Sequence, residues 1–513
     1  MPSSISRPRV VGAGVVLLGV LGLVAYDSRP SVGFEARVRI AVDGPGRAVQ
    51  AGLLGANVAW VDHGDALLVE GTTTFDPAMR SRVLDLTPTS LRYPGGAQAS
   101  VHHWRRGLGP ADQRGSNTHF FTGQDQPTRF GIGEFLALCQ AARAEPFITV
   151  NVLTGTPAEA ADWLATVNRG PVPCRWWELD NEPYLREACQ PTVTMTPEAY
   201  AQRADAVITA LRAVDPTVRI GLPLRSDVIG GVPATAYPGY GATVLAAIRG
   251  DLDFIALHNA YLPVTLGPPP TDRDLFAAAM AGFRVVASDL DHTRALVRRH
   301  RGRDLPLAIT EFGPLFTFEE GPLAAYPATF GGALVVADLL RLFTEQDDVV
   351  LAQVWSLTGN GAFGSVSNRG RIRPTYRVLQ GFRDLMQGRY LRTEVSAPTM
   401  TTTAVGVVPA QTDVPLVVAR GTQDGDLVRV MVLNKSWDSA ATVTIDPGPR
   451  APTDARGRLL SMGKVFGPPD TGPEPNFVPL AVVRGQDPTT LQMTLPGPSF
   501  ALVEFHLSDG VRK

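Results

Sequence analysis

Between residue 50 and about residue 388, short apolar runs alternate with longer stretches of helical periodicity. Several of the runs are apolar almost throughout, as expected for strands of a parallel sheet that is covered on both faces. The eight runs are GLLGANVAW (52–60), TSLRYPGG (89–96), EPFITVNVL (145–153), CRWWELDNEP (174–183), VRIGLPL (218–224), LDFIALHNAY (252–261), LPLAITEFGPL (305–315) and VVLAQVWSL (349–357). Eight strand–helix units are the number that closes a (β/α)8 TIM barrel, so this α/β fold is predicted for residues 49–388.

The stretches between the runs have the start signals of helices. TPEAYAQRADAVITALRAV, for example, begins with Thr196, Pro197 and Glu198. A threonine caps a helix, a proline fits its first turn, and an acid there complements the helix dipole. GIGEFLALCQAARA and TPAEAADWLATVN are further predicted helices.

The sequence on either side of the predicted barrel has the pattern of antiparallel strands. FEARVRIAV (34–42) alternates apolar and polar residues, as a half-exposed strand does. After residue 388, the strands DLVRVMVLN, ATVTIDP, TLQMTLP and FALVEFHL follow one another without helices and are punctuated by Pro and Gly. We therefore predict an all-β sandwich formed mainly by residues 389–513, which the strand within residues 31–48 joins. GPPDTGPEPNF (467–477) is predicted to be a surface loop.

Residues 1–30 carry a targeting pattern. Arg7 and Arg9 precede seventeen uncharged residues, VVGAGVVLLGVLGLVAY, which end before Asp27. A basic start followed by a short apolar run is typical of a secretory signal peptide, and this run is also just long enough to span a bilayer. A cleaved signal and an uncleaved membrane anchor both stay open. Either predicts an exported protein with its catalytic domain outside the cytoplasm.

Composition narrows the class of protein further. The 513 residues are 44% hydrophobic and 19% charged, which is typical of a well-packed globular protein of two or three units. A net charge of −2 with dispersed basic residues indicates no nucleic-acid surface. The three cysteines, Cys139, Cys174 and Cys189, have no metal-ligand spacing. Cys174 begins a strand and Cys189 lies in the loop beyond its far end. They could pair in an oxidising compartment, but this arrangement argues against the Cα separation of at most about 7 Å that a disulfide permits, so their pairing stays open.

Polar and aromatic side chains stand near the carboxyl ends of the predicted strands, where TIM barrels place their chemistry. They are Arg92 on the second strand, Asn181 and Glu182 on the fourth, His258 and Tyr261 on the sixth, Glu311 on the seventh and Trp355 on the eighth. Glu182 and Glu311 thus face one another across the barrel mouth. Two facing carboxylates are typical of glycoside hydrolysis, in which one donates a proton to the leaving oxygen while the other attacks the anomeric carbon or activates a water. The alternative reading of His258 and Trp355 is that both are core side chains.

The two carboxylates need different protonation states. The proton donor needs a raised pKa, whereas the nucleophile must be ionised. A nearby arginine favours the ionised form, and Arg92 is the candidate partner of Glu311. The alternative is that Arg92 forms an internal salt bridge with Glu178 or Asp180, which share the in–out parity of the fourth strand and are predicted to be structural.

Three stretches resemble the retaining α-L-arabinofuranosidases of glycoside hydrolase family 51, in clan A. They are LRYPGGAQASVHHWRRGLGPADQR, FGIGEFLALCQAARAEPFITVNVLTGTPAEAADWLATVN and RWWELDNEP. The resemblance is dense over residues 89–184 and continues in order, more loosely, through HNAY and ITEFG. It implies a barrel with a C-terminal β-sandwich, a carbohydrate substrate and no cofactor.

The resemblance also implies roles for individual residues. Glu182, in the Asn-Glu pair, corresponds to the acid/base, and Glu311 corresponds to the nucleophile. Arg92, in the R-aromatic-Pro-Gly-Gly motif, is expected beside the nucleophile. His258 and Tyr261 are expected to line the sugar subsite, although the family's usual spacing is one residue shorter. The candidate substrate-binding residues are Arg92, Asn181, His258, Tyr261 and Trp355.

Two positions depart from the pattern of the family. Ala97 follows Pro94-Gly95-Gly96 where the family usually has PGGN, and Ala59 stands where a G-x-F-x-E pattern usually has its Glu. Both family residues hydrogen-bond sugar hydroxyls. A site that loses such a partner discriminates less strongly among sugars, so the departures leave the reaction type and weaken the prediction of the sugar.

We predict an exported retaining glycoside hydrolase that acts on a polysaccharide or its fragments without a cofactor. One alternative is another clan A specificity, such as an endo-β-glucanase or a xylosidase-like enzyme, because LDNEP also occurs in the wider clan. The other is a carbohydrate-binding protein that has lost turnover, although such a protein has little need for a matched acid and nucleophile. The sequence predicts neither the linkage, nor exo or endo action, nor the oligomeric state.

Overall fold

The computed structural model describes residues 33–185, 193–225, 237–266 and 271–508. The predicted signal or anchor and Cys189 lie outside these ranges. Within them, Cys139 and Cys174 are buried free thiols. No single described helix is long and apolar enough to cross a membrane. The bent pair of η5 (Pro322–Ala328) and α8 (Phe330–Thr344) would be so only if the two were counted together.

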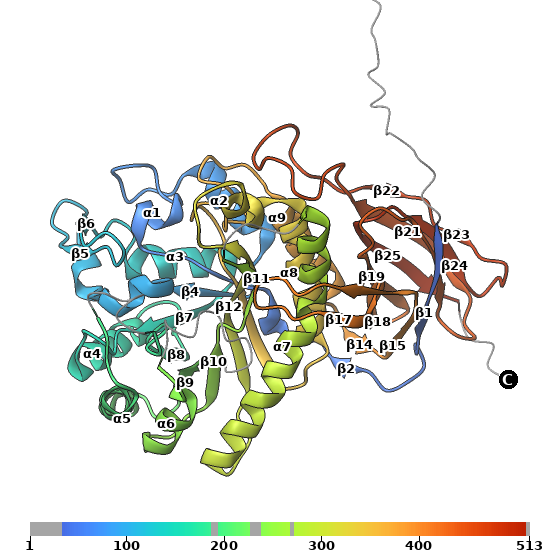
Figure 1. Ribbon diagram of the computed structural model, residues 1–513. Coiled ribbons are helices and arrows are strands. Elements are labelled where there is room, and N and C mark those ends of the chain that lie inside the picture. The colour runs from blue at the N-terminus through green and yellow to red at the C-terminus, as the bar shows by residue number, and fades with distance from the viewer. Residues whose placement is uncertain (1–32, 186–192, 226–236, 267–270, 509–513) are drawn as a thin grey trace, which may run out of the picture.

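Eight parallel strands form a closed barrel, in the order β10-β9-β8-β7-β4-β3-β13-β12, and the pairing of β10 with β12 closes the ring (Figure 1). Seven of these strands lie within predicted apolar runs and β12 runs two residues past the end of its run, so the prediction of a TIM barrel is confirmed. The strands are β3 (Gly55–Asn57), β4 (Ser90–Tyr93), β7 (Glu145–Val150), β8 (Trp176–Leu179), β9 (Arg219–Leu224), β10 (Phe254–Leu257), β12 (Leu307–Thr317) and β13 (Val349–Val354).

The barrel interior changes from apolar to polar along each strand. Phe147, Trp176 and Phe254 belong to an apolar cluster that is separate from the main core. Along β8, Trp176 and Glu178 share one parity, and Glu182 follows the strand, so the chain passes from the apolar cluster through a buried polar layer to the mouth. The catalytic end of the barrel thus rests on a packed apolar base.

Helices surround the barrel on its outer face (Figure 1). In α5, the side chain of Thr196 accepts a hydrogen bond from the backbone N–H of Ala199, which is the cap that the sequence predicted. The helices that follow barrel strands are α2 (Pro77–Leu86), α3 (Ile132–Ala142), α4 (Pro157–Asn168), α5 (Pro197–Val214), α6 (Tyr240–Ala247), α7 (Asp272–Arg301), α8 and α9 (Pro374–Leu385).

The sixth apolar run (252–261) contains one whole strand and the first two residues of another, rather than the single strand predicted. β10 ends at Leu257, and β11 (Ala260–Thr265) begins after a break at His258 and Asn259. β11 pairs with the outer part of β12, which runs on to Thr317. Tyr261 therefore lies on β11 and not at the end of the sixth strand, and Glu311 lies within β12 and not at its end.

The second unit consists of two packed sheets with their own apolar core. In the first sheet, β1 (Phe34–Ile40) lies between β15 and β20, antiparallel to the former and parallel to the latter. In Figure 1 this blue strand stands among the red strands of the C-terminus. The remaining strands of that sheet are β15 (Thr393–Ser396), β20 (Ala441–Asp446), β24 (Leu491–Leu495) and β23 (Val483–Arg484). The second sheet contains β2 (Arg47–Ala48), β14 (Arg389–Leu391), β18 (Val417–Asp424), β19 (Leu427–Asn434), β25 (Ser499–Leu507), β21 (Pro452–Leu460) and β22 (Val478–Leu480).

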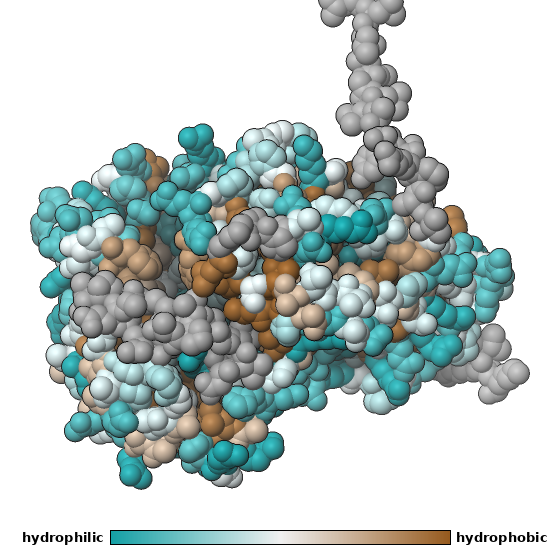
Figure 2. Space-filling model, viewed as in Figure 1, coloured by the Kyte–Doolittle hydropathy of each residue, from teal (hydrophilic) through white to brown (hydrophobic). Residues whose placement is uncertain are grey.

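Helix α8 joins the two units and is buried along its whole length. The Lys435 ammonium, which follows β19, lies 2.7 Å from the Asp338 carboxylate of α8 and 4.3 Å from the centre of the Phe283 ring. Burial lowers the pKa of Lys435 to about 8, although Asp338 opposes this shift. Figure 2 shows hydrophobic residues near the centre of the view, where the barrel meets the sandwich, and mainly hydrophilic residues elsewhere.

Candidate active site

Both carboxylate oxygens of Glu311, on β12, accept hydrogen bonds. Its Oε1 accepts a hydrogen bond from Arg92 Nη1 at 2.7 Å, and its Oε2 accepts one from the Tyr261 hydroxyl at 2.8 Å. Burial and the nearby Glu311 charge raise the pKa of Tyr261 well above its ordinary value, so the phenol remains a donor. A carboxylate with a cation on one oxygen and a fixed donor on the other is oriented for attack.

Glu182 follows β8 and is the more open of the two carboxylates, with 24% of its side chain exposed against 7% for Glu311. Its Oε1 accepts hydrogen bonds from the Tyr184 hydroxyl at 2.8 Å and from His258 Nδ1 at 3.0 Å. Burial raises the pKa of Glu182, but His258, Tyr184 and Arg92 together outweigh burial and hold it below the ordinary value. The sequence argument expected a raised pKa on the proton donor, and His258 is the main reason for the difference.

His258 stands between the two carboxylates. Its Nδ1 lies 3.0 Å from Glu182 Oε1 and 3.8 Å from Glu311 Oε2, and its Nε2 lies 3.1 Å from Thr310 Oγ1. Burial lowers the pKa of His258, but the two carboxylates more than compensate and raise it. The titrations of Glu182 and His258 are therefore linked, because each stabilises the charged form of the other.

The position of His258 also limits the separation of the two carboxylates. Glu182 Oε1 and Glu311 Oε2 can be no further apart than the sum of their distances to Nδ1, which are 3.0 and 3.8 Å. That limit lies below almost all of the roughly 6.5–9.5 Å range of inverting enzymes and includes the about 5–5.5 Å of retaining ones.

Arg92 on β4 is fully buried and connects four side chains. Nε and Nη2 both lie 2.7 Å from Glu178 Oε2. Nη1 donates to Asn57 and Glu311, and Nη2 donates to Asn181. Arg92 thus contacts both Glu311 and Glu178, which the sequence argument had treated as alternatives. Since all three nitrogens donate to protein acceptors, Arg92 positions Glu311 and Asn181. The substrate-binding role that the sequence suggested for Arg92 stays a prediction.

Asp180 supports the turn that presents Asn181 and Glu182. It has a φ of 72°, and its carboxylate accepts hydrogen bonds from the Ser100 hydroxyl and from the backbone N–H groups of Val152, Leu153 and Asn181. Its burial raises its pKa despite these bonds. The positive φ of a non-glycine residue is a strained conformation that this network stabilises.

Glu178 lies one layer deeper than the catalytic carboxylates. Its Oε2 accepts from Thr149 Oγ1 at 2.7 Å, in addition to Arg92, and its Oε1 accepts from Thr310 Oγ1 at 2.7 Å. Glu178 is completely buried, which leaves no path to a substrate. Its function is to hold Arg92 and Thr310.

The glycines of the Pro-Gly-Gly segment allow two close approaches at the barrel mouth. A Cβ on Gly96, where φ is +51°, would lie 2.6 Å from the indole of Trp355, which directly follows β13. A Cβ on Gly95, where φ is +88°, would lie 2.7 Å from Ala59 Cα. Trp355 is half-buried and therefore still presents part of its ring, as a sugar platform requires.

The two departures from the family pattern lie beside these glycines. Ala59 is buried, and its backbone N–H donates to Asp65 Oδ2 at 2.8 Å. Ala97 is half-buried. Neither position offers a side-chain hydrogen bond to a sugar hydroxyl, so any polar contacts of the substrate come from other residues. The amide nitrogen of Asn181 has no hydrogen bond to the described residues, because only its oxygen is held by Arg92.

Three functional residues were not found from the sequence. Asn57 on β3 accepts from Arg92 and donates from Nδ2 to the Thr310 backbone carbonyl at 2.9 Å. Thr310 contacts His258, and Tyr184 contacts Glu182. The available signal was their position, because Asn57 ends β3, Thr310 directly precedes Glu311, and Tyr184 directly follows the Asn-Glu-Pro motif. Among the described residues, no three His, Cys, Asp or Glu side chains are grouped to hold a metal ion.

The comparisons with known proteins agree with this geometry. Residues 82–169 match the family model for the α-L-arabinofuranosidase 1 domain. A probable α-L-arabinofuranosidase C of Aspergillus clavatus is 26% identical over 68% of this chain and 73% of its own length. An intracellular exo-α-L-arabinofuranosidase of Bacteroides ovatus is 24% identical over 82% of this chain and 84% of its own length.

Solved structures reproduce the fold over nearly the whole chain. The family 51 α-L-arabinofuranosidase of Thermotoga petrophila superimposes with a TM-score of 0.76 at 21% identity, over 92% of this chain and all of that one. The match therefore includes the barrel and the sandwich together. With the family model and the relatives, it agrees with the resemblance seen in the sequence: the chain is similar to the α-L-arabinofuranosidases of glycoside hydrolase family 51.

Proposed function

We propose that the protein removes α-L-arabinofuranosyl groups from polysaccharides or their fragments by double displacement. The observation that supports this most directly is the single imidazole nitrogen that lies close to both Glu182 and Glu311. It keeps the carboxylates within the reach of one glycosidic bond. The choice of arabinofuranose as the sugar rests on the names of the relatives. The choice of reaction rests on the paired carboxylates.

In the first step, a Glu311 oxygen attacks the anomeric carbon while the bond to the leaving oxygen breaks. Glu182 transfers its proton to that oxygen, so that a neutral alcohol leaves and a glycosyl ester remains on Glu311. The ester no longer carries the negative charge of Glu311, which removes a like charge from the neighbourhood of Glu182. The resulting carboxylate of Glu182 is then the base that the second step requires.

In the second step, a water molecule gives a proton to Glu182 and its oxygen attacks the anomeric carbon. The ester bond breaks, and Glu311 becomes a carboxylate again. Arg92 and Tyr261 then donate hydrogen bonds to it. The sugar leaves with the configuration with which it arrived, because two inversions have occurred.

The leaving group distinguishes the two carboxylates. Glu182→Ala should still form the glycosyl ester from a dinitrophenyl glycoside, because that leaving group needs no proton. The ester should then accumulate, and added azide should speed turnover. Glu311→Ala lacks the nucleophile and should be inactive on both activated and natural glycosides. The assignment is wrong if azide rescues neither variant, or if the two variants behave alike on the activated substrate.

A substrate panel tests the sugar. Aryl α-L-arabinofuranosides should be hydrolysed in preference to aryl β-glucosides and β-xylosides. Turnover of the β-glycosides alone would favour the wider clan A specificity, and binding without any turnover would favour a carbohydrate-binding protein.

We also propose export. The support is the sequence of residues 1–30, in which Arg7 and Arg9 precede the apolar run. Fractionation of the native host should find the protein outside the cytoplasm, free or bound to membrane, and a cytoplasmic location would contradict this proposal.

A further inference from the structure

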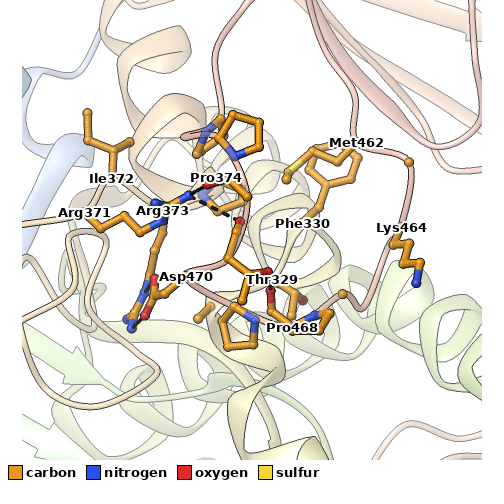
Figure 3. A pocket seen from close by; sticks show the side chains of 18 residues that line it. Thr329, Phe330, Arg371, Ile372, Arg373, Pro374, Met462, Lys464, Pro468 and Asp470 are labelled. Atoms are coloured by element: carbon orange, nitrogen blue, oxygen red, sulfur yellow. Dashed lines mark hydrogen bonds and ion pairs between the residues drawn. The ribbon is translucent and has the colours of Figure 1, made fainter. Parts of the chain in front are cut away.

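A pocket of about 720 Å³ lies outside the catalytic site, between the barrel and a loop of the sandwich (Figure 3). Three segments line it: residues 328–330, which lead into α8, residues 371–374, which lead into α9, and a set of residues within 462–475. Its volume falls in the about 300–1,000 Å³ range of pockets that bind a small organic ligand.

The pocket lies at the same end of the barrel as the catalytic carboxylates. Helices α8 and α9 follow β12 and β13, so both helices begin where those strands end. β12 carries Glu311, and Trp355 directly follows β13. In a barrel of this kind, all the strand-to-helix loops lie on one face. A ligand in the pocket would therefore sit on the same face of the molecule as the glycosidic bond.

The walls of the pocket are mainly apolar and stiff. Figure 3 shows Phe330, Ile372, Met462 and Pro468 around the cavity, and further prolines of the loop complete the wall. Pyranose rings present their C–H faces to such surfaces. An apolar wall with a few convergent polar groups is the usual composition of a ligand pocket.

One ion pair in the pocket is already satisfied. Nε and Nη2 of Arg373 lie 3.0 and 2.7 Å from the two oxygens of Asp470, and Nη1 donates to the backbone carbonyls of Gly361 and Gly364. The hydrogen bonds from Arg373 hold the pKa of Asp470 below its ordinary value. This pair is neutral as a unit and fixes the loop of the sandwich to the barrel.

Two further cations of the pocket have no carboxylate partner among the described residues. Arg371 donates to two backbone carbonyl oxygens of the loop, and Lys464 is exposed. The neighbouring carboxylate of Glu474 is directed elsewhere, since it accepts from the backbone N–H of Ile372 and lies 3.6 Å from Arg82. The pocket thus combines apolar walls with an excess of positive charge.

We propose that this pocket binds a hexuronic acid residue of the polysaccharide whose arabinosyl group enters the catalytic site. The ring would pack on the apolar wall, and its carboxylate would pair with the exposed ammonium of Lys464, while Arg371, on the other side of the pocket, adds to the positive charge. An ammonium on a flexible stem suits a carboxylate on a carbohydrate chain. That the ligand is a carbohydrate chain rests on the proposed function. The new claim is that the pocket prefers acidic over neutral carbohydrate chains.

The binding test compares two ligands that differ only in charge. The probe is a xylo-oligosaccharide that carries a glucuronic acid, and its control is the same chain with the carboxyl reduced to CH2OH. Calorimetry at low salt should find the acidic chain bound about three- to tenfold more tightly, as expected for a partly exposed charge pair. The difference should shrink in 0.5 M salt, because exposed charges are screened.

Matched variants locate the effect. Lys464→Gln should abolish most of the preference for the acidic chain, whereas Lys464→Arg should keep it. Arg299→Gln removes the same charge from an exposed position near the end of α7, at the opposite end of the barrel, and should leave the preference unchanged. Hydrolysis of an uncharged aryl α-L-arabinofuranoside, which carries no hexuronic acid, should be the same in all three variants.

The proposal is overturned if the acidic and reduced chains bind equally, or if Arg299→Gln weakens binding as much as Lys464→Gln does. It is also overturned if free acetate or inorganic phosphate competes as strongly as the acidic chain, which would indicate a general anion site. Failure of the proposed function is a separate result. It would appear as absent hydrolysis of the aryl arabinofuranoside by the unmodified protein, whatever the calorimetry finds.

Discussion

His258→Gln should move the alkaline limb of the pH profile of kcat/KM to higher pH. The hydrogen bond and the charge of His258 are the largest influences that lower the pKa of Glu182 against the effect of burial. Removing them raises that pKa. Because Glu182 must be protonated to assist the leaving oxygen, a higher pKa keeps the active form present to higher pH.

The size of the shift follows from the 3.0 Å contact between His258 Nδ1 and Glu182 Oε1. A hydrogen bond to a charged group contributes about 1.5–3 kcal/mol, and about 1.4 kcal/mol corresponds to one pKa unit. The alkaline limb should therefore move by about one to two pH units. Glutamine can place an amide near the position of Nε2, which preserves the contact with Thr310, but it offers no donor at Nδ1 and no charge.

The assay is kcat/KM as a function of pH, on an aryl α-L-arabinofuranoside whose leaving group needs a proton. His258→Asn places an amide nitrogen near the position of Nδ1, so it keeps a neutral hydrogen bond and should shift the limb less. Tyr184→Phe removes the other donor to Glu182 and should shift the limb in the same direction. An alkaline limb that stays in place or moves to lower pH in a folded His258→Gln protein would refute this account of the proton.

Three further substitutions test the surroundings of the site. Arg92→Lys leaves buried acceptors unpaired, so the urea midpoint should fall by the equivalent of about 3–5 kcal/mol. The nucleophile also loses its orientation, so kcat should fall at least about a hundredfold. An unchanged kcat would contradict the positioning role of Arg92. Gly96→Ala forces a side chain into the φ of +51° and against the indole of Trp355, so KM should rise more than kcat falls in steady-state assays. Lys435→Met leaves the buried Asp338 with one cation fewer, and thermal unfolding should show a loss of about 1–3 kcal/mol that Asp338→Leu in the same chain partly restores.

The barrel could be predicted from the sequence because its signals are local. Each strand is a short apolar run, and helix starts such as that at Thr196 have their cap within three residues. The split between β10 and β11 escaped prediction because Ala260 and Tyr261 continue the same run after His258 and Asn259. Periodicity cannot show that the backbone leaves one strand and begins another when both pair with β12.

The sequence could place Glu182 and Glu311 at one mouth because strand ends in this fold share one face, and their predicted catalytic roles come from the family motifs. The hydrogen bonds between strands could not be located in the same way. Arg92 reaches Glu178 and Glu311 at once, and nothing in the spacing of three distant segments indicates that one guanidinium serves both. The low pKa of Glu182 likewise depends on His258, 76 residues away.

Strand β1 is made early in synthesis, long before the strand with which it pairs in parallel. It lies in the interior of its sheet, and its Arg37 pairs with Asp446, 409 residues further along the chain. At about 5–20 residues per second, a ribosome needs roughly 20–80 seconds to produce that partner. Throughout this interval the amphipathic segment Phe34–Ile40 has no sheet to join, while the barrel can already close. The newly made chain thus carries an unpaired apolar strand until the last unit emerges, and that strand is the segment that chaperones would need to shield.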